Sequence, residues 1–184
     1  MDLLKAVNLV LRKIGEIPVT SIDEQYPTLT IVLPALEEAR IRLLSEGYWF
    51  NTYYKHTLQP DVNGVVNLPL NCLKFFPEEE RHKFTGVGIA DTDTGTIFIH
   101  EQVTGRLIVD VPFEQLVEVM QYAVAYSAAH DTYLSDIGDD DICRKLEARR
   151  DEFLEQVNGD HTISRKQNSR KKKQAMRWRQ ALTT

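Results

Sequence analysis

Cysteine is scarce in this sequence, and so are residue clusters of the kinds that bind metals or phosphates. Only 2 of the 184 residues are cysteine, and Cys72 and Cys143 lie 71 positions apart. This spacing excludes a zinc knuckle and a disulfide framework, so we expect two reduced, buried thiols. The 5 histidines are scattered without the spacing of metal ligands, and no glycine-rich phosphate loop occurs. The sequence therefore predicts no metal site and no cofactor.

Long apolar runs are also missing. No stretch approaches the ~18 apolar residues that a membrane span needs, and no basic segment followed by an apolar run stands at the N-terminus. We therefore expect a soluble, unprocessed chain without a membrane partner. The composition, 42% hydrophobic and 27% charged residues, is that of a globular protein with enough apolar content for one domain and an appendage.

Charge is unevenly distributed along the chain. Residues 158–184 contain 8 basic residues and 1 acidic residue, a net charge of +7, so the overall charge of −5 leaves −12 for the first 157 residues. A basic tail favours a negatively charged partner, whereas an acidic body repels phosphates. The basic residues, with the tryptophan that lies among them, are Arg165, Lys166, Arg170, Lys171, Lys172, Lys173, Arg177, Trp178 and Arg179.

The first quarter of the sequence has the periodicity of helices. Apolar residues recur at spacings of three and four from Leu3 to Ile14, Asp2 is available as an N-cap, and Gly15 ends the pattern. The loop that follows contains three apolar residues that we expect to fold back onto the helices: Ile17, Val19 and Ile22.

A second helix is predicted to end at Glu46. Its start is open between two positions, because Pro34 is tolerated in a first turn but removes a hydrogen bond further inside a helix. The helix begins either near Leu33 or near Thr28 with a kink at the proline, and we favour the earlier start. Four charged residues are expected on its solvent face: Glu37, Glu38, Arg40 and Arg42.

A glycine followed by aromatic residues lies where the helical pattern gives way to that of strands. Gly47 can adopt the positive φ that ends a helix, and the aromatic residues after it have strand propensity. No side chain there suits nucleophilic chemistry, so we interpret the stretch as packing that anchors a core or an interface. We call it the hinge, and it comprises Gly47, Tyr48, Trp49, Phe50 and Asn51, with Tyr53 and Tyr54 beyond.

From residue 49 to residue 111 the hydrophobic period changes to two. Asn63 and Gly64 predict a hairpin, because both central positions of a type I′ turn need positive φ. Three further strands are expected over residues 86–90, 96–100 and 105–111. The segment from Leu70 to Phe84 contains a proline and a charged run, and we expect it to be an exposed loop.

Helical spacing returns at Phe113 and continues to the break S-D-I-G-D-D-D. Three aspartates, residues 139–141, then occupy the first turn of a last helix, where negative charge meets the positive end of the helix dipole. Gly159 is predicted to end this helix. The segment beyond it has too few apolar residues to offset its ordering entropy, so it is expected to order only on docking.

Helices on both sides of a run of strands indicate an α+β fold. We predict an antiparallel bundle of about four helices, with a small antiparallel β domain inserted into it and an extended basic C-terminal tail. The bundle would comprise residues 1–48 and 113–157, the β insertion residues 49–112, and the tail residues 158–184.

Several motifs occur in a fixed order and spacing. They are V-N-L-V-L-R-K-I-G-E-I-P-V-T-S-I-D in the first helix and loop, E-G-Y-W-F-N-T at the hinge, L-Q-P-D-V-N-G, and P-F-E-Q-L-V where the helices resume. In this order they resemble tail tubular protein A of short-tailed bacteriophages, most strongly in I-G-E-I-P-V and G-Y-W-F-N. The resemblance covers about residues 3–157 and not the basic tail. These motifs mark a family rather than an active site.

The resemblance implies a structural adaptor of the virion tail, assembled in the host cytoplasm, without enzymatic activity. Twelve copies of such a protein close into a ring beneath the portal and above the nozzle protein, tail tubular protein B. The ring surrounds the channel through which the genomic DNA leaves, and it helps to seat the tail fibres. An acidic body agrees with this role, because adhesion to a polyanion grows with each lysine or arginine presented.

Two interpretations of the basic tail stay open. In the first, the tail docks on acidic surfaces of the portal or a neighbouring subunit, with Trp178 as a desolvated anchor. In the second, the cations bind DNA and the tryptophan stacks on a base. We favour docking. The rival functions are a DNA-binding accessory protein and a tail-associated glycan hydrolase, for which Glu114 and Glu118 would share a helix face.

Overall fold

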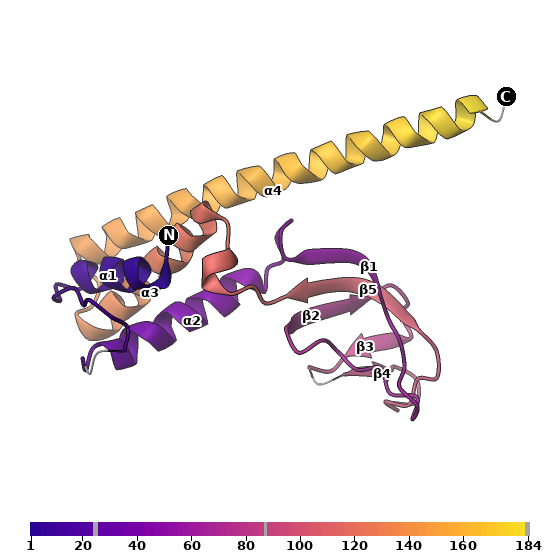
Figure 1. Cartoon of the computed structure of the whole chain (residues 1–184), viewed down its shortest axis with the longest axis horizontal. Coiled ribbons are helices and arrows are strands. Elements are labelled where there is room, and N and C mark those ends of the chain that lie inside the picture. The colour runs from indigo at the N-terminus through magenta and orange to yellow at the C-terminus, as the bar shows by residue number, and fades with distance from the viewer. Residues whose placement is uncertain (24–25, 87, 183–184) are drawn as a thin grey trace. The chain divides into compact units, whose positions relative to one another are not determined.

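The computed structural model of the chain describes residues 1–23, 26–86 and 88–182, and from residue 167 onward it describes the backbone alone. The fold is α+β, as the sequence predicts. The chain forms two compact units, which we call the helical unit (Met1–Ala39 with Phe113–Thr184) and the β unit (Arg40–Pro112). Figure 1 shows α1, α3 and α4 in the helical unit and β1 to β5 in the β unit.

The first helix of the helical unit, α1, is the one that the sequence predicts. It spans Leu3–Lys13, and the Asp2 carboxylate caps it by accepting the backbone N–H of Lys5 at 2.7 Å. Four apolar residues on one face are fully buried: Ala6, Val7, Val10 and Leu11. In the loop after α1, Val19 is buried as expected, whereas Ile17 is 74% exposed and does not fold back.

The helix α3 (Glu118–Asp136) provides most of the core of the helical unit. A separate 3-10 turn, η1 (Phe113–Gln115), precedes it, so the sequence prediction of one continuous helix from Phe113 is wrong. Glu114 and Glu118 consequently lie on different elements. Small buried residues on α3 let both α1 and α4 contact it closely, and these residues are Ala123, Ala125, Ala128 and Ala129.

The last helix, α4 (Asp141–Leu182), is longer than the sequence predicts. Its start is fixed by the Asp140 carboxylate, which accepts the backbone N–H groups of Ile142 at 2.8 Å and Cys143 at 2.9 Å. Gly159 does not end it, because one glycine inside a helix costs only about 1 kcal/mol relative to alanine. None of the helices that the structure describes is both long and apolar enough to cross a membrane.

The helix α2 (Leu29–Leu44) contains Pro34, which confirms the earlier of the two predicted starts. Its N-terminal part belongs to the helical unit and buries Leu29, Val32 and Leu36. Its last turns, from Arg40 on, belong to the β unit. The expectation that Arg40 faces solvent is wrong, since this side chain is buried in the β unit.

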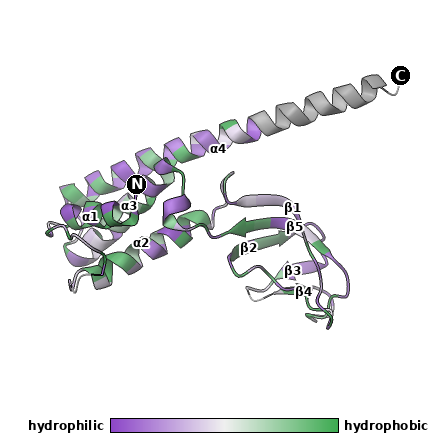
Figure 2. Cartoon of the chain, viewed as in Figure 1, coloured by the Kyte–Doolittle hydropathy of each residue, from purple (hydrophilic) through white to green (hydrophobic). Residues whose placement is uncertain are grey.

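The β unit contains two antiparallel sheets. In the larger sheet β5 (Val103–Val109) is central, between β1 (Thr52–Leu58) and β2 (Cys72–Pro77). The smaller sheet pairs β3 (His82–Phe84) with β4 (Ile89–Asp91). Hydropathy is highest along β5 and β2, whereas β1 is more polar, as Figure 2 shows.

The predicted loop from Leu70 to Phe84 is wrong, because this segment forms β2 and β3 and contributes to the core. Phe75 on β2 is 1% exposed and is among the largest fully buried side chains of the chain. The proline that argued against a strand is the last residue of β2, where a missing N–H is tolerated. Conversely, residues 96–100 form no strand, and Phe98 makes only an isolated bridge to Val65.

One position in the β unit requires glycine because β5 passes close to β2 there. A Cβ atom at Gly105 would lie 2.5 Å from the carbonyl oxygen of Phe76 and 2.6 Å from the Phe75 ring. Only glycine fits at such distances, so the Phe75 ring can approach the backbone of β5 closely.

We expect Gly105→Ala to lower the free energy of unfolding by about 1–3 kcal/mol, because the added methyl group overpacks the core. Denaturant unfolding of the purified chain measures the change. The matched control is Gly88→Ala, where the added Cβ would meet only the carbonyl oxygen of Val66 at 3.9 Å. Equal stability of the two variants would contradict this account of the core.

Candidate functional site

The hinge residues form a turn between α2 and β1. Tyr48 is buried, Trp49 and Phe50 are half-buried, and the Tyr48 and Phe50 rings stack with their centroids 5.9 Å apart. The two tyrosines beyond, Tyr53 and Tyr54, are 55% and 56% exposed. Only the first part of the aromatic run therefore packs inside the β unit.

The polar residue of the hinge, Asn51, is its most buried member at 0% exposure. The side-chain oxygen accepts the backbone N–H of Tyr48 at 2.8 Å. The side-chain amide donates to the carbonyl oxygens of Leu44 at 2.9 Å and Val109 at 3.0 Å. Asn51 thus ties the end of α2 to the end of β5 with a single side chain.

Gly47 brings the same turn against β5. Its φ is +80°, and a Cβ atom here would lie 2.6 Å from Cδ1 of Ile108. Both the backbone conformation and the space favour glycine, as the sequence predicts for the end of a helix.

A buried ion pair lies beside the hinge. The Arg40 guanidinium pairs with the Asp110 carboxylate through both of its terminal nitrogens and also donates to the carbonyl oxygen of Val111 at 2.6 Å. The Arg40 side chain is 8% exposed and that of Asp110 is 30% exposed. A guanidinium buried to this extent needs all of these acceptors, because an unpaired buried charge is very costly.

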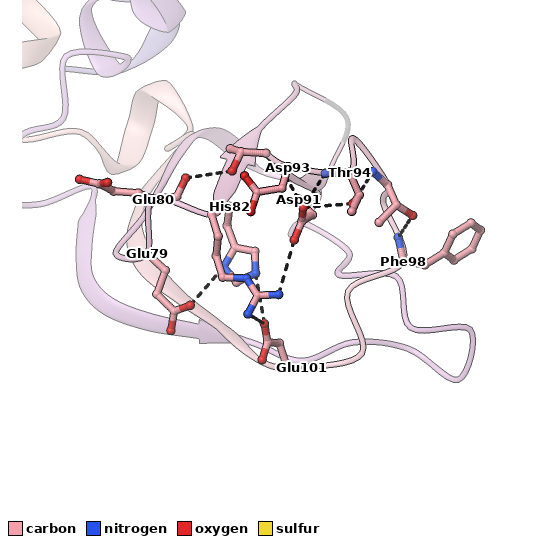
Figure 3. Close-up of polar contacts among 11 residues, drawn as sticks. Glu79, Glu80, His82, Asp91, Asp93, Thr94, Phe98 and Glu101 are labelled. Carbon is pink, nitrogen blue, oxygen red and sulfur yellow. Dashed lines mark hydrogen bonds and ion pairs between the residues drawn. The ribbon is translucent and has the colours of Figure 1, made fainter.

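Around His82 at the start of β3 lies a polar cluster, which comprises Glu79, Arg81, His82, Asp91 and Glu101. Figure 3 labels the histidine and the three carboxylates of this cluster. The imidazole Nδ1 lies 3.9 Å from Oε2 of Glu79, and Nε2 lies 3.4 Å from Oε1 of Glu101. Asp91 is the pairing partner of His82 in the β3–β4 sheet. With a neutral imidazole, three carboxylates and one guanidinium give the cluster a net charge of −2, which favours cations over phosphates.

Asp91 holds the turn after β4. Its Oδ1 accepts the N–H groups of Asp93 and Thr94, each at 2.9 Å, and the Thr94 hydroxyl at 3.0 Å. These hydrogen bonds lower the pKa of the Asp91 carboxyl, and the one from the backbone N–H of Thr94 has the largest effect. Its Oδ2 lies 3.5 Å from Nη2 of Arg81, whose Nη1 lies 3.3 Å from Oε1 of Glu101.

Two pockets accompany these features, one in each unit. The pocket in the β unit has a volume of about 300 Å³. It is lined by Arg81, Asp91, Glu101 and the three residues directly before Glu101, which are Phe98, Ile99 and His100. The pocket in the helical unit has a volume of about 520 Å³. Its charged and aromatic lining consists of Lys13, Tyr126, Lys145, Arg149 and Glu152. The second pocket is therefore predominantly basic within an acidic body.

The predicted docking residues follow one another on α4. Arg165 and Lys166 are exposed there. The remaining ones lie in the part of the helix whose side chains are outside the described structure: Arg170, Lys171, Lys172, Lys173, Arg177, Trp178 and Arg179. In the preceding turns of α4 the arginines pair with acids of the same helix, as Arg149 does with Glu152 and Arg150 with Glu147.

Sequence reasoning missed both buried polar sites. The five histidines have no metal-ligand spacing, yet the fold brings His82 together with two glutamates. The one available signal was the spacing of three between Glu79 and His82. Arg40 could not be distinguished from the solvent-facing charges around it, because Asp110 lies 70 residues away.

Comparison with known proteins places these features within one family. A family model described as tail tubular protein matches residues 4–167. Tail tubular protein A of Klebsiella phage KP34 is 27% identical to this chain over 183 residues, which cover 97% of this chain and 96% of that relative. The residues that the family model matches include the hinge, the whole β unit and the first two basic residues of the predicted docking segment.

We expect Asn51→Ala to lower the free energy of unfolding by about 2–4 kcal/mol, because it leaves buried backbone groups without their side-chain partner. Denaturant unfolding measures the loss. Asn67→Ala is the control, since that exposed amide makes one long hydrogen bond of 3.3 Å to Asp61, and it should change stability by less than about 0.5 kcal/mol. A similar loss in both variants would argue against the anchoring role of Asn51.

We expect the stabilising effect of Asp91 to disappear in acid. Because its pKa is lowered in the folded state, the contribution is fully present above the unfolded value of about 3.9 and is lost as the pH falls through the lower folded value. Unfolding of the parent chain and of Asp91→Asn, measured from pH 7 to pH 2, tests this. The parent should be more stable at neutral pH and lose that advantage below about pH 4; a difference independent of pH would refute the expectation.

Proposed function

We propose that this chain, which belongs to the tail tubular protein family, forms the adaptor ring that joins the portal to the tail nozzle. Members of the family are structural components of the phage virion tail and not enzymes, so the open question is the assembly role. The observation that carries the proposal is the family match over residues 4–167. In this role the ring would contain twelve copies, surround the DNA exit channel and help to seat the tail fibres.

The division of the chain into two units supports a ring. A ring of identical subunits related head to tail requires two different surfaces on each subunit. The helical unit and the β unit, each with its own core, offer such surfaces. On the β unit, the exposed Tyr53 and Tyr54 add aromatic area, which is typical of residues that anchor interfaces.

The charge of the body supports a channel through which DNA passes without being held. The first 157 residues carry a net charge of −12. Each cation that contacts a phosphate strengthens adhesion to DNA, so a predominantly acidic wall would leave the genome free to move.

The basic segment of α4 would then dock on an acidic surface of the portal or of a neighbouring subunit. The segment 158–184 carries +7 and has no acidic residue after Asp160. A cationic segment with one tryptophan matches an interface in which an aromatic anchor is surrounded by charged contacts. Binding of the same segment to DNA would instead support the second candidate, a DNA-binding accessory protein.

Electron micrographs of the purified protein, alone and mixed with portal, test the ring. We expect twelvefold rings that stack on portals. Monomers that retard DNA on a gel and do not stack on portals would refute the adaptor and support the accessory protein.

We expect a chain truncated after Lys166 to keep its fold and to lose the ability to join portals. The truncation removes six of the eight basic residues of the segment and Trp178 but keeps every side chain that the structure describes. A full-length variant with the same six residues changed to glutamine is the matched comparison, because it removes the charge and retains the length. Normal portal joining by both variants would refute docking through this segment.

A further inference from the structure

The imidazole of His82 is buried, with 1% of its side chain exposed. Among the residues that the structure describes, neither Nδ1 nor Nε2 has a hydrogen-bond partner. An imidazole always carries at least one N–H, and buried polar groups in folded proteins almost always have partners. A buried imidazole without a hydrogen bond therefore indicates a missing ligand or proton.

Two carboxylates approach the nitrogens of this ring, Glu79 at Nδ1 and Glu101 at Nε2, as the dashed lines in Figure 3 show. Glu79 comes from the turn before β3, which is closed by the His82 N–H donating to the Glu79 carbonyl oxygen at 3.1 Å. Glu101 comes from the segment before β5. One ligand atom of each of the three residues lies within 4.8 Å of the other two. The glutamate side chains are 67% and 50% exposed, so both can turn and water can complete a coordination shell.

We propose that Glu79, His82 and Glu101 bind a divalent metal ion, and that zinc fits best. The Nε2 and Oε1 atoms of His82 and Glu101 are 3.4 Å apart. An ion at the usual zinc distance of about 2.0–2.1 Å from both atoms would see them at an angle of about 110°, which is close to tetrahedral. Glu79, whose side chain is 67% exposed, would supply the third ligand by rotating from Nδ1 toward the ion.

The ligand types favour zinc over calcium or magnesium. Calcium and magnesium prefer oxygen ligands alone, whereas an imidazole with carboxylates and water suits zinc. The charge also fits, because the net −2 of the cluster matches a divalent cation.

Arg81 competes with this ion for the Glu101 carboxylate. Its guanidinium lies 3.3 Å from the Glu101 oxygen and 3.5 Å from Oδ2 of Asp91. When Glu101 turns to the metal, Arg81 keeps its contact with Asp91. The affinity for the ion therefore depends on how strongly Arg81 holds Glu101.

The ion would add a polar link to the smaller sheet of the β unit. The strands β3 and β4 have only three residues each, and Ile89 of β4 already joins them to the core of the unit. An ion held by the turn before β3 and the segment before β5 would connect this small sheet to the larger one. It would act as a structural site, independently of any role of the chain in a ring.

Titration of the full-length chain tests the site. The chain is stripped with EDTA, dialysed, and titrated with zinc chloride in the presence of a competing chromophoric chelator. We expect one zinc ion per chain and a higher melting temperature with zinc. Glu101→Gln should weaken zinc binding at least about tenfold, and Arg81→Gln should strengthen it. Magnesium chloride at the same concentration should have no effect.

Two matched variants separate this site from other zinc ligands. Glu80→Gln removes the same charge from a neighbouring exposed residue and should leave the affinity unchanged. Cys72→Ser removes the half-buried thiol of β2 and should also leave it unchanged. Because His82→Gln can fail to fold, the imidazole is followed by NMR in the parent chain, where zinc should shift one histidine signal.

Three results of the binding measurements would overturn the proposal. They are the absence of zinc binding, equal affinity in the parent and Glu101→Gln, and equal weakening by Glu80→Gln and Glu101→Gln. A histidine signal that titrates with pH but does not respond to zinc would assign the two carboxylates to a protonated imidazole instead, and this too would overturn the metal site.

Discussion

The β unit depends on the buried pair of Arg40 and Asp110, because this pair joins the two ends of an inserted segment. Arg40 is the first residue of the unit, and Asp110 lies two residues before its last. An insertion must bring its ends together, and closing a loop of this length costs conformational entropy. A buried ion pair adds little net stability over an apolar replacement, but it strongly disfavours arrangements that separate its partners. The ion pair therefore contributes more to fixing the two ends of the β unit next to each other than to the free energy of unfolding.

The hinge connects the two joined ends of the β unit to its larger sheet. Asn51 binds the backbone of α2 and of β5 with its side chain, and its carbonyl oxygen accepts the N–H of Val109 at 3.0 Å. The next residue, Thr52, begins the β1–β5 pairing opposite Ile108. The pairing of β1 with β5 thus starts next to Asn51, and a bulge between Tyr53 and His56 shifts its register before His56 pairs with Gly105. The same strand, β5, brings Gly105 against the Phe75 ring, so the hinge and the tightly packed core share one strand.

The features that the sequence predicted are those that depend on local periodicity, and those that it missed depend on distant partners. The bounds of α1, its Asp2 cap and the early start of α2 follow from spacing within a few residues. The sequence does not predict strand β2, because Pro77 and the charges after it indicate a loop. Burial of Phe75 favours the strand more than these two signals disfavour it. The hinge was recognised from its aromatic residues, yet Asn51 makes the decisive contacts. Glu101 lies nineteen positions after His82, so no motif could have joined them.

The helix α4 differs in charge between its N-terminal part and its C-terminal part. In its N-terminal turns the arginines are neutralised by acids three residues away, as in the pairs of Arg149 with Glu152 and Arg150 with Glu147. After Asp160 the sequence supplies cations without any further acid. Like charges on neighbouring turns repel one another and weaken a helix. The last part of α4 thus lacks, within its own sequence, the acidic partners that the first part has, and the docking that we propose would supply them from another surface.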